Sequence, residues 1–192
     1  MSTYYEISEP DVVWGDYGRF LFSGMNGNEV GDARFPVKLM RTGPFVPKLS
    51  FPWGYFVLHA DIGRALETQH FKGVRLADVE LAKIVNVNWH EWDQSSNDPE
   101  RYPAGGEPEN YVLRRKHSDA VASQLPKLVA LDVPVLQEPP KRTPLEAEGV
   151  DPSTDAFEWG WRLYASEKLM GWFKEMVPEC ISISKPMRLF EK

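Results

Sequence analysis

The stretch with the most reactive side chains is His90-Glu91-Trp92-Asp93, which places one imidazole beside two carboxylates. Metal and acid/base sites need such groups to converge, and helical metal motifs do this with a second histidine at i+4. No histidine stands four residues from His90, and neighbouring residues of an extended loop point in different directions. We interpret the stretch as a solvated loop anchored by a tryptophan. A small hydrolase that uses His90 and nearby acids is the least favoured alternative.

The remaining nucleophiles and glycines lack the neighbours that catalysis requires. Ser95-Ser96 has no glycine framing of a nucleophile elbow, and Gly105-Gly106 is followed by Glu-Pro, which does not suit a phosphate loop. Cys180 is the only cysteine, so it forms no internal disulfide, and we expect a small buried hydrophobe. Three isolated histidines are expected to be hydrogen-bonded in the core or at helix ends: His59, His70 and His117. We predict a non-enzymatic protein without metal or cofactor.

The charge of the chain is concentrated in two segments. The formal net charge is -6, and that sign argues against binding to nucleic-acid phosphates, which needs clustered Lys and Arg. Residues 88–110 hold six acids and one base, whereas residues 143–158 hold five acids and no base. The rest of the chain, with 17 acids and 21 bases, is positive. The acidity therefore belongs to these two predicted loops.

Both acidic segments stand next to tryptophans, which suggests a surface for a basic protein. Charged loops commonly serve solubility alone, and this reading stays open. Aromatic anchors with an acidic rim, however, are what binding to a basic partner would use. The candidate partner-binding residues are Trp89, Trp92, Glu91, Asp93, Glu146, Glu148, Asp151 and Asp155.

Length and composition predict one folded domain. With 192 residues, of which 42% are hydrophobic and 12% aromatic, the chain can bury a sizeable core. The first residues lack the basic and apolar regions of a secretory signal, and no apolar run approaches the roughly 18 to 20 residues that span a bilayer. We expect a cytoplasmic chain that does not enter a membrane. A homodimer is left open.

The elements that must position these residues are organised around an internal repeat at about residues 53–79 and 159–184. Each range reads as a strand, a capped helix and a second strand, so we predict an α+β fold with two related units in one domain, joined by long Pro-rich loops. Asp61 and Ser166 are the predicted N-caps. Pro178 should end the second helix.

Outside the repeat, the sequence predicts shorter elements. Residues 3–7 read as a strand at a sheet edge and residues 35–40 as another short strand. Residues 17–22 are an aromatic run followed by an Asn-Gly turn, which is compatible with a hairpin. Residues 111–131 have weak helical character, with Ser118 as a candidate cap.

The order of these patterns resembles a family of bacterial immunity proteins encoded beside polymorphic toxins, including the group named for a double CXXCG motif. The likeness is carried by Tyr4-Tyr5-Glu6-Ile7, by the strand-helix-strand pattern at 57–76 and by its counterpart at 163–183. Members of the double-motif group carry two Cys-x-x-Cys-Gly pairs that look zinc-binding. This chain has none, so no metal is carried over.

The resemblance implies an inhibitor that binds the cytoplasmic toxin domain of its cognate toxin, often a nuclease, and blocks its active site or substrate channel. A nuclease domain is expected to be basic because it must meet phosphates. The two acidic segments are a reasonable complement. The alternative from another class is a non-enzymatic adaptor or structural subunit of a secretion or regulatory complex.

Overall fold

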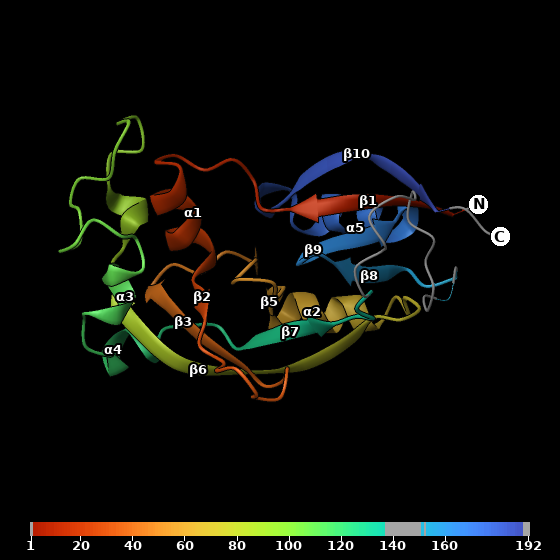
Figure 1. Ribbon diagram of the computed structural model, residues 1–192, viewed down its shortest axis with the longest axis horizontal. Coiled ribbons are helices and arrows are strands. Elements are labelled where there is room, and N and C mark those ends of the chain that lie inside the picture. The colour runs from red at the N-terminus through yellow and green to blue at the C-terminus, as the bar shows by residue number, and fades with distance from the viewer. Residues whose placement is uncertain (1, 137–150, 152, 190–192) are drawn as a thin grey trace.

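The computed structural model describes residues 2–136, 151 and 153–189, and it has an α+β fold with two sheets (Figure 1). The six-stranded sheet has the order β2-β3-β6-β7-β5-β4, in which β3 and β6 are parallel and the other pairs are antiparallel. Its strands are β2 (Met25–Asn26), β3 (Val37–Gly43), β4 (Leu49–Ser50), β5 (Val57–His59), β6 (Arg75–Asn86) and β7 (Leu128–Asp132).

The second sheet is antiparallel and has the order β10-β1-β9-β8. The N-terminal strand lies in its interior, paired on one side with β9 and on the other with β10. The expectation of an edge strand at residues 3–7 is therefore wrong, because a strand closer to the C-terminus covers the second edge. The strands are β1 (Ser2–Ser8), β8 (Ala156–Trp159), β9 (Arg162–Ser166) and β10 (Ser182–Leu189).

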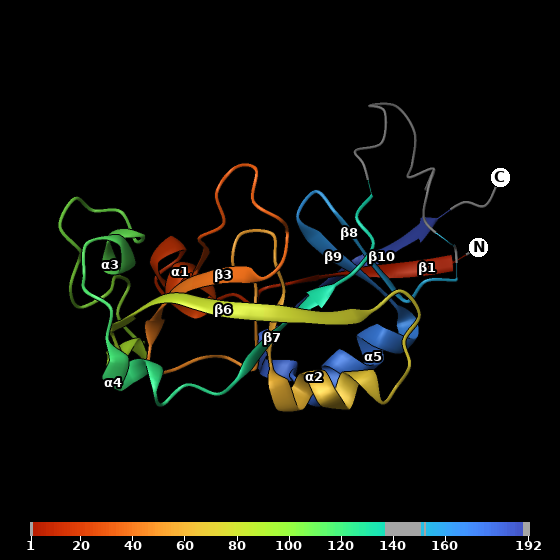
Figure 2. The same ribbon diagram turned by 90° about the horizontal axis from the view of Figure 1, so that it is seen from below.

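Both ranges of the predicted repeat have the element order strand-helix-strand. In the first, α2 (Ala60–Glu67) connects β5 to β6, and in the second, α5 (Glu167–Met176) connects β9 to β10. In each case one antiparallel strand separates the two connected strands, β7 in the first and β1 in the second, so the connected strands are parallel. Figure 2 shows α2 and α5 side by side, and Phe71 and Trp172 pack there with ring centroids 6.1 Å apart.

The two helices of these units begin in different ways. Ser166 caps α5 through its side chain, which accepts a hydrogen bond from Leu169 N at 3.3 Å, as predicted. The predicted cap at Asp61 is wrong, because β5 passes directly into α2 and His59 occupies the N-cap position. Asp61 lies in the first turn instead, where its negative charge interacts favourably with the helix dipole.

The first 25 residues differ most from expectation. Residues 17–22 belong to helix α1 (Asp16–Ser23), not to a strand, and the turn-forming glycines Gly15 and Gly24 flank it with φ values of 56° and 75°. Phe20, Leu21 and Phe22 are all buried there. The aromatic run is thus explained by burial of a helix among several elements rather than by β-propensity.

The segment between β6 and β7 is mostly irregular. It holds the 3₁₀ turn η1 (Trp89–Glu91) and two short helices, α3 (Asn110–Leu113) and α4 (Asp119–Ala122). Ser118 caps α4 through Val121 N, as the sequence predicts. A second 3₁₀ turn, η2 (Pro178–Cys180), follows α5, which ends before Pro178 as predicted. Among the described residues, none of the helices has the length and apolarity to cross a membrane.

Candidate functional site

The two predicted tryptophan anchors hold the first acidic segment to the rest of the molecule. Trp89 is only 3% exposed and packs edge-on against Trp14 and Phe45, with ring centroids 6.0 and 5.7 Å away. Trp92 is partly buried against Trp14 and Tyr111. In this conformation Trp89 has almost no exposed surface to offer a partner. Both indoles pack residues 88–110 against the rest of the molecule.

The predicted acids of the second segment that the structure describes are tied to the chain itself. Asp151 pairs with Lys72 Nζ at 2.8 Å, and this lysine together with Ser153 holds the pKa of the carboxyl far below its usual range. Asp155 accepts hydrogen bonds from Lys72 N at 2.8 Å and from Ser166 Oγ at 2.7 Å. These contacts are structural. Glu146 and Glu148 lie outside the described residues.

The predicted acids of the first segment, Glu91 and Asp93, are exposed, and neither is paired with the His90 ring. Asp93 accepts hydrogen bonds from Ser95 N and Oγ at 2.9 and 2.6 Å, which close a turn and lower its pKa, while Glu91 is exposed on η1. His90 lies against the Phe45 ring, and burial lowers its pKa. In the part of the chain that the structure describes, no three His, Cys, Asp or Glu side chains are placed to hold a metal.

The described residues of the two acidic segments lie far apart. Residues 88–110 lie at one end of the molecule beside α1 and α3, whereas Asp151 and Asp155 lie near the opposite end, beside the turn that leads into β6 (Figures 1 and 2). A single partner face built from both segments is therefore not supported by the positions of the described residues.

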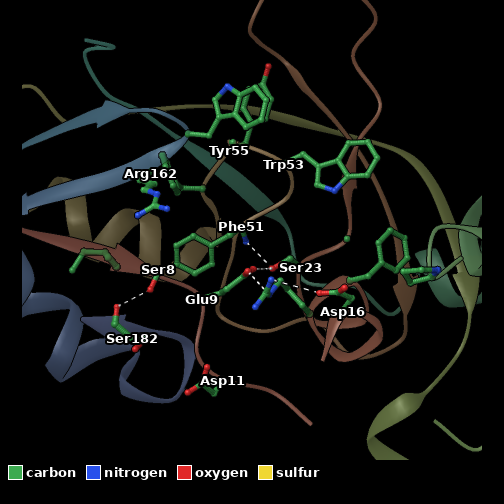
Figure 3. A pocket seen from close by; sticks show the side chains of 18 of the residues that line it. Ser8, Glu9, Asp11, Asp16, Ser23, Phe51, Trp53, Tyr55, Arg162 and Ser182 are labelled. Atoms are coloured by element: carbon green, nitrogen blue, oxygen red, sulfur yellow. Dashed lines mark hydrogen bonds and ion pairs between the residues drawn. The ribbon is translucent and has the colours of Figure 1, made fainter. Parts of the chain in front are cut away.

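A pocket of about 660 Å³ lies where parts of both sheets meet, and it brings together acids from segments far apart in sequence (Figure 3). Its walls come from the end of β1 and the residues that follow, from α1, from residues 51–56, from residues 107–109 and from the β8–β9 turn. We call it the acidic groove. Six carboxylates and two guanidinium groups line it: Glu6, Glu9, Asp11, Asp16, Glu107, Glu109, Arg19 and Arg162.

Half of these carboxylates are already paired within the chain. Arg162 Nη1 lies 3.0 Å from a carboxylate oxygen of Glu6, and Arg19 Nε lies 2.7 Å from Glu9. Arg19 Nη1 also lies 3.7 Å from Oδ1 of Asp16. Burial nevertheless raises the pKa of Glu9, against the opposing effects of Arg19 and Ser23.

The other half carries uncompensated charge. The carboxylates of Asp11, Glu107 and Glu109 make no hydrogen bond or ion pair with any described residue. The last two belong to the first acidic segment, so this segment contributes to the groove through its C-terminal end. We refer to these three residues as the free acids of the groove.

Two exposed tryptophans form the rim. Trp53 and Trp161 are 54% and 80% exposed, and both have a left-handed backbone, with φ values of 40° and 65°. Figure 3 shows Trp53 and Tyr55 on one side of the pocket and Asp11 on the other. A Cβ atom at Gly54 would lie 3.2 Å from Cγ of Trp161, so the indole rests against this glycine. The rim is therefore a joint surface of two distant loops.

The groove was not predicted from sequence, although one signal for it exists. The chain places glycine next to tryptophan in Trp14-Gly15, Trp53-Gly54 and Gly160-Trp161, and all six of these residues have positive φ. A bulky residue with positive φ is uncommon and costs free energy, so its presence needs a reason in packing or in function. Trp14 is buried, whereas Trp53 and Trp161 are at the groove.

Comparison of the chain with models of protein families, with curated proteins and with solved structures finds no match. The acidic groove is the feature of the described residues that points to a function.

Proposed function

We propose that this protein is an immunity protein that binds and neutralises a cognate bacterial toxin domain, and that the acidic groove is its binding surface. The observation that carries the proposal is the meeting of three free acids and two exposed indoles in one hollow. The resemblance in the order of its sequence patterns supplies the class of partner. Binding alone accounts for the function, without a catalytic step.

Electrostatics favour a basic partner at this groove. Unpaired carboxylates in a concave surface attract cations over a distance of about 8 Å at physiological salt. A nuclease-like toxin domain presents such cations where it meets nucleic-acid phosphates. An inhibitor that neutralises those groups would block the substrate channel, which explains inhibition by occupancy.

The tryptophans of the rim would slow the dissociation of such a complex. Charged groups at a protein interface mainly raise the association rate, whereas buried aromatic anchors slow dissociation. Trp53 and Trp161 already stand exposed at the edge of the groove, so little rearrangement is needed to bury them. We propose these two indoles as the anchors, in place of Trp89 and Trp92.

The proposal is tested by co-expressing the protein in the bacterial cytoplasm with the C-terminal domain of the toxin-like product of a neighbouring gene. Host survival together with co-purification is the expected result. Continued toxicity without a complex contradicts the proposal for that pair. A complex without protection also contradicts it and favours an adaptor.

A matched pair of variants locates the surface in the same assay. The groove variant combines Asp11→Asn, Glu107→Gln and Glu109→Gln, and should weaken protection. The control variant carries the same change of charge on exposed acids outside the groove, through Asp78→Asn, Glu80→Gln and Glu175→Gln. It should protect like the wild type.

A further inference from the structure

In the acidic groove, the two exposed tryptophans lack the cation that lies over other aromatic rings among the described residues. At Tyr55, which also lines the groove, Arg34 lies over the ring with its Cζ 5.3 Å from the centroid and pairs with the buried carboxylate of Glu158. Arg115 lies over Tyr111 in the same manner, at 5.5 Å. At both places the chain itself covers an aromatic face with a guanidinium group.

Trp53 and Trp161 have no such companion. Among the described residues, no Lys or Arg lies over either indole ring. Arg19 and Arg162 are engaged with Glu9, Asp16 and Glu6 and leave the three free acids unpaired. Two open indole faces and three unpaired carboxylates thus line the same hollow.

We propose that the groove binds arginine side chains from an extended segment of the partner, with one guanidinium stacked on Trp161 and others paired with the free acids. This inference rests on the proposed function, whose partner it makes more specific. The volume of the groove, about 660 Å³, lies within the range of sites that enclose ligands larger than one side chain. A segment with more than one arginine therefore fits it.

Arginine is favoured over lysine by the geometry of the two groups. A guanidinium is planar, is weakly hydrated, stacks on an aromatic face and bonds a carboxylate through two parallel N–H groups. An ammonium group is a compact, strongly hydrated charge that stacks less well. Tryptophan is the best aromatic partner for a cation.

The test uses the purified full chain and a short, blocked peptide of alternating arginine and glycine, with binding measured by titration calorimetry over a salt series. Two matched peptides replace arginine by lysine or by citrulline, which is neutral and nearly isosteric. We expect salt-dependent binding of the arginine peptide, weaker binding of the lysine peptide and none of the citrulline peptide. Equal binding of the arginine and citrulline peptides, or no binding of any, overturns the inference.

Two variants then locate the binding. The first is Trp161→Asn, which suits the local turn, and the second is the groove variant. Each should lower the affinity for the arginine peptide roughly 5- to 30-fold, the loss expected for a cation–π contact or a partly desolvated ion pair. The control variant should bind like the wild type. Unchanged affinity in both the Trp161 and groove variants overturns the inference, provided that urea unfolding shows them to be folded.

The outcomes separate this inference from the proposed function. Protection against the toxin by a protein that does not bind the arginine peptide refutes the inference and leaves the proposed function standing. Arginine-specific binding at the groove without protection refutes the immunity function and leaves the arginine site standing.

Discussion

At the scale of single residues, Trp161 stands in a turn that its side chain does not favour. The turn between β8 and β9 has two central residues, Gly160 and Trp161, with φ values of 56° and 65°, and the flanking pair is Trp159 with Arg162. These are the signs of a type I′ turn, which prefers Asn-Gly because both central residues need positive φ. A tryptophan there is strained, and its 80% exposure gives little burial in return.

Trp161→Asn should therefore keep or increase stability. Asparagine visits the left-handed region more readily than tryptophan, and left-handed backbone costs other L-residues roughly 1–2 kcal/mol, so we expect a gain of about 1 kcal/mol in the free energy of unfolding. The measurement is the urea midpoint at unchanged m-value. A clear loss of stability would show that the indole's contact with Gly54 outweighs the strain.

Glu9 should make the free energy of unfolding depend on pH, and the direction of this dependence can be worked out. Its folded-state pKa is raised above 4.5, first by burial, while Arg19 and Ser23 oppose the shift and Asp16 adds to it. A carboxyl with a raised folded pKa favours the folded state below its unfolded pKa, and this contribution is lost as pH rises through the folded pKa.

The stability of the wild type relative to Glu9→Gln should thus fall as pH rises from 4.5 toward neutrality. Urea unfolding of both proteins over this range measures it. The variant keeps the shape of the side chain but does not titrate at this site, so parallel pH profiles would show that Glu9 has no raised pKa.

At the scale of elements, local signals were sufficient where one segment determines its own structure. Helix α5 was predicted from its Ser166 cap, its apolar stripe and Pro178, all of which act within a few residues. Helix α1 was missed because its aromatic run fits a strand equally well, and burial by other elements decides. The interior position of β1 depends on β10, more than 170 residues away.

Ser166→Ala tests the cap. The side chain accepts from Leu169 N and donates to Asp155, so its loss should lower the free energy of unfolding by about 1–2 kcal/mol. Urea unfolding measures the change. A loss below a few tenths of a kcal/mol would mean that solvent replaces both contacts.

Asp155→Ala tests whether this acid is structural rather than part of the interface. Removing its two hydrogen bonds should lower the free energy of unfolding by about 2 kcal/mol, without changing the affinity of the folded protein for a basic partner. Because Asp155 and Ser166 share a hydrogen bond, the double variant should lose less than the sum of the single variants. Additive losses would show that the two residues act independently.

At the scale of the whole molecule, the acidic groove exists only after folding. Its walls come from six segments, between Glu6 and Ser182, that are brought together where parts of the two sheets meet (Figures 1 and 3). The charge of residues 88–110 was visible in the sequence, yet only Glu107 and Glu109 of its acids line the groove. The partners of Asp151 and Asp155 were not predictable, since Lys72 lies about 80 residues earlier.

Recruitment of a basic partner by the groove is measured by the rate of association with the cognate toxin domain over a salt series. Wild type and the control variant should associate fast at low salt and slow steeply as salt rises, because unpaired acids steer a basic partner. The groove variant, without the charges of Asp11, Glu107 and Glu109, should associate more slowly and with a shallower salt dependence. Identical rates and slopes for all three proteins would show that the groove does not recruit the partner.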